Sequence, residues 1–500
     1  MTQPPGPRRA TSANLVGTVV SALANLGFTV LVTRTVGRHE AGALFTATSL
    51  FVVLQITSRL GADTGATYFI SRTIALGDRR KARDYLTVLR RPVVTASVIG
   101  CAGLVAAAFA WGVRPANDVG AFLLVLALFL PAATFSDVAL AASRGFGGMR
   151  STVLLDKLLR PVTQLLLVGL AVAVGAGILL PLAWAIPYAV SMVLAARALR
   201  PQLRGLHRDD SDTRDTAREF WRFTAPRALA SVAQTLIQRV DIVLVAVIRG
   251  PRDAAIYTAA TRFVAVVQML NLAISQPAQP QFAGQLATGD LVAARRLYRK
   301  TTAWLVLLGW PLLLLCLVAG HLYLHVFGHG YSGSAAATVV VILAVAMMLA
   351  FACGTVDMLL IMGGRTTWNL ATTLGALVAL VAVDLALIPG HGVVGAAIGW
   401  AAAIAVSNLV PLAVVHRALR LHPIGAATLC AAALTAISFA GVPALVFALA
   451  GHTTWGWAVV GVAAGGALFV AGCWAARRLL DLPELLAVVP RRRPAVDNLR

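Results

Sequence analysis

The sequence predicts an all-helical membrane protein with about fourteen transmembrane helices. Hydrophobic side chains make up 59% of its 500 residues, and 43 glycines come in addition, whereas soluble domains reach about 45–50% apolar residues with glycine included. Charged residues make up 12%, about half of the usual share. The apolar residues also fall in long runs. This pattern excludes a soluble enzyme, a disordered chain and a disulfide scaffold.

Fourteen apolar runs are long enough to cross a bilayer, which requires about 20 residues in a helix. We expect them at 13–33, 42–71, 93–112, 119–142, 155–173, 178–196, 223–248, 254–280, 301–325, 335–362, 367–388, 393–415, 424–449 and 455–476. The longest polar stretch between them, 197–222, is too short for a soluble domain and indicates a linker.

The positions of the basic residues predict the orientation. The net charge is +22, and with the N-terminus inside, 33 of the 42 Lys and Arg residues fall in inner segments when Lys157 and Arg160, at the inner end of span 155–173, are counted with them. Five fall in outer loops and four deeper within spans. Because cytoplasmic loops of membrane proteins carry an excess of Lys and Arg, we expect both termini in the cytoplasm. The charge therefore indicates topology and gives no reason to expect a nucleic-acid partner.

An internal repeat predicts two related halves. Residues 43–52 and 255–264 match at an offset of 212, with five identical positions. Spans 1–6 and 7–12 would then form two pseudo-symmetric six-helix lobes of the same orientation, an arrangement known in transporters, followed by two C-terminal helices. The expected divisions are a cytoplasmic N-terminus 1–12, an N-lobe 13–196, a cytoplasmic linker 197–222, a C-lobe 223–415, additional spans 416–476 and a basic cytoplasmic tail 477–500.

Short motifs in a fixed order point to a family. They are Thr33–Gly37 in the first half and, in the second, Gln238–Leu244, Ala255–Ala260, Gln279–Gln281, Val326–Tyr331, Met362–Arg365 and Leu387–Ala397. Over about residues 12–420 the chain resembles the polysaccharide transport branch of the MOP exporter superfamily. That branch includes Wzx-type (O-antigen) and teichoic-acid flippases, and it is related to lipid II flippases and MATE drug exporters.

The resemblance implies two lobes around a central cavity that opens alternately to either side. It implies a flippase for a saccharide carried on polyprenyl pyrophosphate, in the cytoplasmic membrane of a bacterium, serving cell-surface polysaccharide or lipopolysaccharide biosynthesis. Expected partners are that lipid-linked saccharide, membrane lipids, and glycosyltransferases or a polymerase of the same pathway. We expect no enzymatic activity, catalytic residue, cofactor or metal.

Polar residues inside the expected spans are candidates for contact with the substrate. A charge at the bilayer centre costs about 2.5–3.5 kcal/mol on insertion scales, and a diphosphate favours the paired hydrogen bonds of arginine. The candidates are Arg59, Asp63, Arg239, Asp241, Arg262, Gln268 and Asn271. Structural roles stay open for them: Arg59 and Asp63 share a helix face and can neutralise each other, and Asp241 and the amides can bond neighbouring helices.

Three aspartates stand alone in their spans, namely Asp137, Asp357 and Asp384. A lone carboxylate in a membrane helix suits coupling to H⁺ or Na⁺. A hydrogen bond to a neighbouring helix is the structural alternative.

Two other functions fit the same span count. A MATE-like cation-coupled multidrug antiporter would need acidic cavity residues, whereas the charges within these spans include several arginines. A membrane glycan polymerase or ligase would be expected to carry a large outer loop, and here no outer loop exceeds about ten residues.

Overall fold

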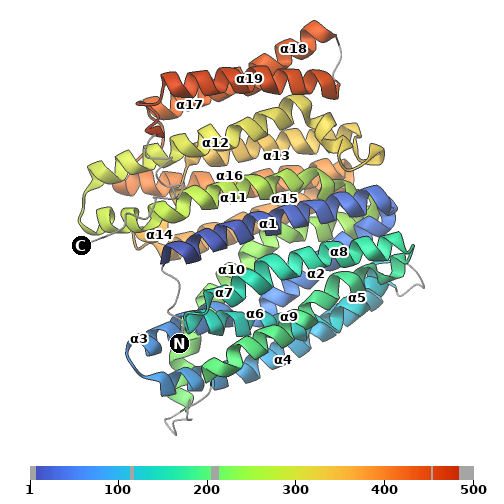
Figure 1. The fold of residues 1–500 in the computed structure, drawn as a ribbon, viewed down its shortest axis with the longest axis vertical. Helices are drawn as coiled ribbons and strands as arrows, with labels where there is room; N and C mark the ends of the chain where they lie inside the picture. Colours follow the sequence, from blue (N-terminus) through green and yellow to red (C-terminus); the bar gives the residue numbers. More distant parts are fainter. Residues whose placement is uncertain (1–6, 113–117, 204–212, 452–453, 483–500) are drawn as a thin grey trace, which may run out of the picture. The chain divides into compact units, whose positions relative to one another are not determined.

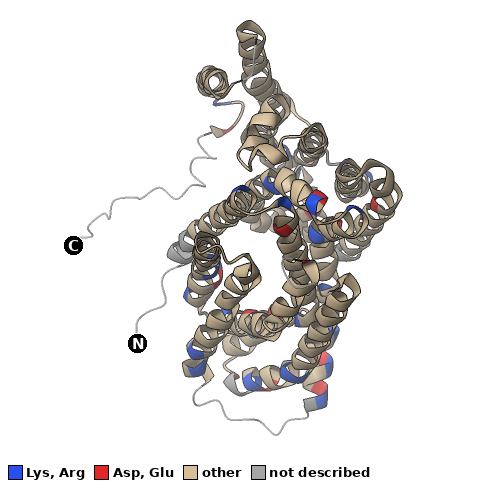
Figure 2. Ribbon diagram, turned by 90° about the vertical axis from the view of Figure 1, so that its right-hand side faces the viewer, with Lys and Arg blue, Asp and Glu red and all other residues tan. Residues whose placement is uncertain are grey.

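The computed structural model describes residues 7–112, 118–203, 213–451 and 454–482. Every regular element among these residues is a helix. Figure 2 shows that charged residues are sparse along the ribbon, as the composition requires. Parts of the expected N-terminus (1–6), linker (204–212) and basic tail (483–500) lie outside the described residues.

The helices are labelled in Figure 1. In the first half they are α1 (Pro7–Thr35), α2 (Arg38–Arg59), α3 (Ala62–Ala75), α4 (Arg79–Trp111), α5 (Val119–Ala127), α6 (Leu130–Gly145), α7 (Met149–Thr152), α8 (Arg160–Ala173) and α9 (Leu180–Leu203). In the second half they are α10 (Thr213–Arg249), α11 (Pro251–Ala287), α12 (Leu291–His325), α13 (Ser334–Cys353), α14 (Val356–Met362), α15 (Thr366–His391), α16 (Val393–Leu419), α17 (Ala426–Ala436), α18 (Val442–Ala450) and α19 (Trp455–Ala475).

Each of the fourteen apolar runs is mostly helical. Twelve helical segments of the described chain are long and apolar enough to cross a membrane, and the pair α5–α6, bent by 50°, makes a thirteenth. The expected fifth span is helical as well, because α7 continues through a π-helical stretch, Val153–Leu159, into α8. The structure therefore confirms the all-α class, and its 12 to 13 candidate spans are roughly consistent with the predicted fourteen.

Helix boundaries repeat along the chain at nearly the offset of the sequence repeat. In the first half α1 ends at Thr35 and α2 begins at Arg38, whereas in the second half α10 ends at Arg249 and α11 begins at Pro251. These boundaries lie within two residues of the offset of 212. Each half thus begins with a corresponding pair of helices.

The chain divides into two compact units. Unit 1 consists of Met1–Arg262, His325–Ala336 and Leu377–Trp400, and unit 2 consists of Phe263–Leu324, Ala337–Ala376 and Ala401–Arg500. Unit 1 therefore extends beyond the expected N-lobe. It also holds α10, the start of α11, the connection between α12 and α13, and the facing ends of α15 and α16.

Small residues let the helices of unit 1 approach closely. A methyl group added at Gly65 of α3 would lie 2.4 Å from Thr224 Oγ1 of α10, and one added at Gly145 of α6 would lie 2.7 Å from Ile70 Cβ of α3. Neither distance leaves room for a side chain. Close packing at small residues drives helix association in membranes, where lipid provides little hydrophobic incentive.

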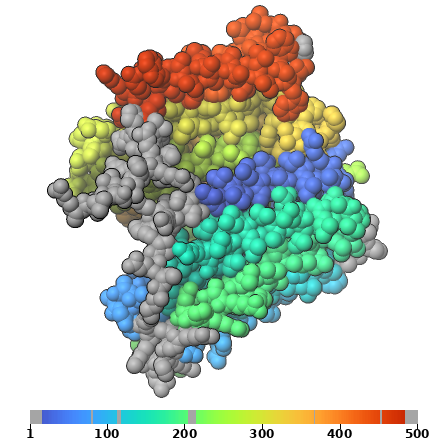
Figure 3. Space-filling model, viewed as in Figure 1, coloured from blue at the N-terminus to red at the C-terminus, as the bar shows by residue number. Residues whose placement is uncertain are grey.

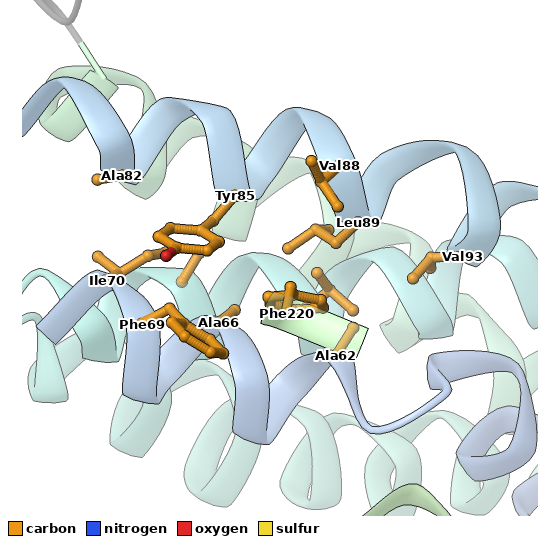
Figure 4. Packing of buried hydrophobic residues seen from close by; sticks show 12 residues of the cluster. Ala62, Ala66, Phe69, Ile70, Ala82, Tyr85, Val88, Leu89, Val93 and Phe220 are labelled. Carbon is orange, nitrogen blue, oxygen red and sulfur yellow. The ribbon is translucent and has the colours of Figure 1, made fainter. Parts of the chain in front are cut away.

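A buried cluster joins α3, α4, α6 and α10 within unit 1 (Figure 4). Its buried members are Ala62, Ala66, Phe69, Ile70, Ala82, Tyr85, Val88, Leu89, Val93, Val138, Ala142 and Phe220. The rings of Phe69 and Tyr85 are stacked with centroids 4.6 Å apart. Aromatic pairs at such distances add stabilisation to that of burial alone.

The second part of the expected linker is ordered, because it forms the start of α10. Glu219 accepts a hydrogen bond from Arg72 Nη1 (3.0 Å) and another from the Tyr85 hydroxyl (2.9 Å). Phe220, the next residue, is fully buried in the cluster of Figure 4. These contacts attach the start of α10 to α3 and α4.

In unit 2 the C-terminal helices pack against α12. Figures 1 and 3 show α17 to α19, in orange and red, beside the yellow α12 and α13. Leu322 of α12, Phe447 of α18 and Ala458 of α19 share one buried cluster. Trp304 of α12 donates from Nε1 to the carbonyl of Leu480, after α19 (3.0 Å). Helices α17 to α19 are thus an integral part of unit 2.

Candidate substrate and coupling site

Several charged residues inside the helices of unit 1 gather around Asp137 of α6. Arg59 Nη2 of α2 lies 2.6 Å from Asp137 Oδ2, and Arg160 Nη1 of α8 lies 3.5 Å from Asp137 Oδ1. Gln55 Nε2, one turn before Arg59, also donates to Asp137 Oδ2 (2.6 Å). The sequence suggests that Asp137 stands alone in its span. In the structure it is instead bonded to residues of two other helices, α2 and α8.

A helix break separates Arg59 from Asp63. Leu60 and Gly61 have positive φ angles of 52° and 72° and separate α2 from α3. Arg59 therefore ends one helix and Asp63 lies in the first turn of the next, with 3.8 Å between Arg59 Nη1 and Asp63 Oδ2. The ion pair between Arg59 and Asp63, expected on one continuous helix, is present. Its distance of 3.8 Å is longer than the 2.6 Å between Arg59 and Asp137.

Arg160, Asp156 and Tyr188 are not among the residues predicted from the sequence. Arg160 Nη2 pairs with Asp156 one turn earlier, and its guanidinium carbon lies 4.9 Å from the centroid of the Tyr188 ring of α9. The sequence signal that could have identified them is the spacing of Asp156 and Arg160, four residues apart at the start of an apolar run. With Arg59, Asp63 and Asp137, the cluster has two guanidinium groups against three carboxylates.

Arg239 of α10 is the unpaired cation among the candidates. No described residue forms a hydrogen bond or ion pair with it, although its side chain is partly buried. Asp241 of its own helix and Tyr188 of α9 lie within electrostatic range. Since Tyr188 also contacts Arg160, the structure brings Arg239 close to the Asp137 cluster. An arginine within a membrane helix needs water or an anionic partner.

Asp241 forms a bond between helices. Its Oδ2 accepts from the Tyr257 hydroxyl of α11 (2.7 Å), and its Oδ1 accepts from the backbone N–H of Ile242 (2.8 Å). Tyr257 is fully buried. These bonds fit a structural role for Asp241. A bond to a neighbouring helix was the alternative to contact with the substrate.

Asp384 of α15 is a buried carboxylate of unit 1 without a hydrogen-bond partner in the described part of the chain. It is fully buried, and neither carboxylate oxygen has a hydrogen-bond partner among the described residues. Asp241 and Tyr257 lie within its electrostatic range. On α16, Gly399 faces it so closely that an added methyl group would lie 2.0 Å from Asp384 Oδ1. A buried carboxyl without a partner is costly unless it takes up a proton or a cation.

The remaining candidates have other surroundings, although Arg262 lies within electrostatic range of Asp241. Arg262 Nε donates to the carbonyl of Thr258 in its own helix (3.1 Å). Asn271, in unit 2, accepts a hydrogen bond from Ser275 (2.7 Å), and Gln268 is in the same unit. Asp357, at the start of α14 in unit 2, has an exposed side chain.

At one end of unit 1, segments from both halves of the chain are bonded together. Arg34, at the end of α1, donates from Nε to the Val326 carbonyl (2.7 Å) and from Nη2 to that of His325 (3.3 Å). Arg38 Nη1 donates to the carbonyl of Gly330 (3.1 Å). These bonds tie the α1–α2 connection to the α12–α13 connection.

Two family models match the sequence. Residues 226–386 match the model described as MatE, and residues 8–283, more than half of the chain, match that of a polysaccharide biosynthesis protein. The chain belongs to the polysaccharide biosynthesis protein family. Membership of this family confirms the resemblance to the MOP superfamily and fits its Wzx-type flippase branch. No curated protein matches the sequence.

Solved structures of the MOP superfamily share the fold. The lipid II flippase MurJ, in an inward closed conformation, matches with a TM-score of 0.73 and 11% identity over 93% of this chain and 99% of that one. A multidrug resistance MATE family transporter, inward-facing, matches with a TM-score of 0.62 and 16% identity over 80% and 95%. A MOP superfamily transporter from Pyrococcus furiosus matches with a TM-score of 0.57 and 15% identity over 82% and 95%.

The family and the fold establish the broad class. This member of the polysaccharide biosynthesis protein family is a multi-pass membrane protein of the transporters and flippases of the MOP superfamily.

Proposed function

We propose that this protein is a flippase that moves a saccharide linked to polyprenyl pyrophosphate from the inner to the outer leaflet of a bacterial cytoplasmic membrane. Membership of the polysaccharide biosynthesis protein family supports that role. In this proposal both termini are cytoplasmic, and residues 13–196 and 223–415 form lobes that rock about the substrate. Residues 416–476 add two helices, and glycosyltransferases or a polymerase of the same pathway supply or use the saccharide.

The observation that supports an anionic substrate is the unpaired Arg239. The cluster around Asp137 has its guanidinium groups matched by carboxylates, so it has no surplus cation to offer. Arg239, partly buried near Tyr188, can donate paired charge-assisted bonds to a diphosphate without breaking an existing pair. Arg239 would then hold the headgroup as it crosses, while the prenyl chain stays in lipid.

Asp384 is the best-supported coupling residue of the three candidates. Asp137 already has two cationic partners, and Asp357 is exposed, whereas Asp384 is buried with both oxygens free of hydrogen bonds among the described residues. We propose that Asp384 takes up a proton or Na⁺ during the transport cycle. The bond between Tyr257 and Asp241 would connect this event to the helix that carries Arg239.

In the proposed orientation, the end held by Arg34 and Arg38 faces outward. Their bonds to the α12–α13 connection would have to open for release to the outer leaflet. Three hydrogen bonds to carbonyls are few enough to break and reform, since each contributes about 0.5–1.5 kcal/mol net and charged donors somewhat more.

A flipping assay tests the proposal. The purified protein is reconstituted in liposomes with a fluorescent polyprenyl-pyrophosphate saccharide, and a membrane-impermeant quencher reports the share of label in the outer leaflet. We expect quenching beyond that of protein-free liposomes. The same label on a prenyl chain without the diphosphate should not move. Equal movement of both lipids would contradict recognition of the headgroup.

A MATE-like cation-coupled antiporter is the second candidate, because the MatE model matches residues 226–386. It predicts export of cationic dyes, driven by a proton or Na⁺ gradient, from the same liposomes. Dye export without flipping of the labelled lipid would favour this candidate over the flippase.

A further inference from the structure

A cavity with a cationic lining lies in unit 2, apart from the residues discussed above. It has a volume of about 310 Å³ and is lined by the start of α12, the start of α17 and the segment after α19. Four of its lining residues are basic, namely Arg295, Arg296, Arg299 and Lys300 of α12. Asp481 is its one acidic lining residue within the described chain.

The basic side chains are only partly satisfied by the protein. Lys300 Nζ lies 3.6 Å from Asp481 Oδ2, whose side chain is 53% exposed. Arg295 Nη2 donates to the carbonyl of Arg420 (3.2 Å), and Arg299 contacts the ring of His422. The Nε groups of both Arg295 and Arg299 are buried without a hydrogen-bond partner in the described chain. Buried donors of this kind call for an acceptor.

The cationic character of the cavity comes from side chains and not from the helix end. The N-terminus of α12 is already capped, because Asp290 Oδ1 accepts from the backbone N–H of Ala293 (2.9 Å). The four basic residues lie between the first and third turns, on a helix long and apolar enough to span a membrane. Such a position places them at the level of lipid headgroups.

Apolar surface adjoins the cationic cavity. Val292 and Leu479, which line it, are 71% and 49% exposed, and Ile424, shortly before α17, is 55% exposed. The ring centroid of Trp304 lies 5.3 Å from Lys300 Nζ. A free phosphate ion would not contact this apolar surface. An amphiphile with an anionic head and acyl chains can contact both the basic residues and the apolar side chains.

We propose that this cavity binds the phosphate group of an anionic glycerophospholipid, with its acyl chains along the exposed apolar side chains. Basic pockets between membrane helices on the cytoplasmic side are suited to such headgroups. The bound lipid would connect the start of α12 to α17 and to the segment after α19. A zwitterionic headgroup brings its own cation and would bind less tightly beside four basic residues.

The test uses the full-length protein, delipidated in a neutral detergent, with lipid binding measured by native mass spectrometry. The probes are phosphatidylglycerol, phosphatidylcholine of the same chain length, and inorganic phosphate as competitor. The pocket variant is Arg295→Gln with Arg299→Gln. The control is Arg90→Gln with Arg91→Gln, two exposed arginines of α4.

We expect the wild type to bind phosphatidylglycerol at least about tenfold more tightly than phosphatidylcholine, a difference of about 1.4 kcal/mol. The pocket variant should lose that preference and the control should keep it. Because the Arg295 bond to Arg420 also supports the fold, Arg296→Glu, at an exposed rim position, serves as a second variant and should weaken binding too.

Three results would overturn the proposal. Equal binding of phosphatidylglycerol and phosphatidylcholine would show that the protein does not distinguish lipids by the charge of the headgroup. Displacement of the lipid by inorganic phosphate at matched concentrations would show a simple anion site. An equal loss of binding in the α4 control and in the pocket variants would show that total charge, and not this cavity, attracts the lipid.

Discussion

Replacing Asp137 by asparagine tests whether the charge cluster of unit 1 is an interlocked structural element. The asparagine keeps the shape and can still accept a bond from Gln55, but it removes the charge that balances Arg59 and Arg160. The carboxylate has two guanidinium nitrogens at 2.6 and 3.5 Å, and its side chain is 9% exposed.

The expected cost follows from these contacts. Removing one partner of a buried ion pair costs about 3–5 kcal/mol. Here Arg160 keeps Asp156, and Arg59 keeps Asp63 at 3.8 Å, so we expect a loss of about 2–3 kcal/mol of unfolding free energy, below that range.

Asp63→Asn is the matched control. Its ion pair is longer and its side chain is 29% exposed, so the loss should stay below about 1 kcal/mol. Unfolding is followed in mixed micelles by titration with a denaturing detergent. A double-mutant cycle between Arg59→Ala and Asp137→Ala should give a coupling energy of at least about 1 kcal/mol. An Asp137→Asn protein as stable as Asp63→Asn would refute the reasoning.

Three further predictions concern other parts of unit 1. Glu219→Gln removes the ion pair with Arg72 and weakens the bond from Tyr85; it should cost about 0.5–1 kcal/mol and speed hydrogen exchange in residues 213–222, and unchanged exchange would argue against this attachment of α10. Asp384→Asn should abolish the dependence of flipping on an imposed proton or Na⁺ gradient without destabilising the protein, because it removes an unpartnered buried carboxyl; a variant that still responds to the gradient would exclude Asp384 as the coupling residue. Arg34→Gln removes the guanidinium bonds to two carbonyls and should speed hydrogen exchange in residues 325–331, with Arg90→Gln as an exposed control; equal exchange in both variants would show that Arg34 does not hold this end.

The sequence predicts the helices well because each span is a local property. An apolar run of sufficient length must be helical in a bilayer, where every backbone group needs an internal partner. The break within the expected span 42–71 is not visible in hydropathy. It depends on Leu60 and Gly61 adopting positive φ angles, which leaves the apolar character of the run unchanged.

Partners at long range could not be predicted from one sequence. Arg59 and Asp137 are 78 positions apart, and nothing local distinguishes this pairing from that with Asp63. Arg160 was missed because it stands at the charged inner end of a span, where positive charge has a topological explanation. The helical start of α10 was not predicted, because the charged residues around Phe220 make segment 213–222 polar although Phe220 itself is buried.

The role of Arg239 is the central claim, and flipping by Arg239 variants tests it most directly. Arg239→Ala, Arg239→Lys and the control Arg227→Ala, an exposed arginine of the same helix, are compared in the liposome assay with the labelled polyprenyl-pyrophosphate saccharide. Charge-assisted hydrogen bonds contribute about 1.5–3 kcal/mol, so Arg239→Ala should slow flipping by about tenfold or more, with Arg239→Lys in between and the control unchanged. If Arg239→Ala, at equal reconstitution, flips the lipid as fast as the control, the proposed headgroup contact is wrong.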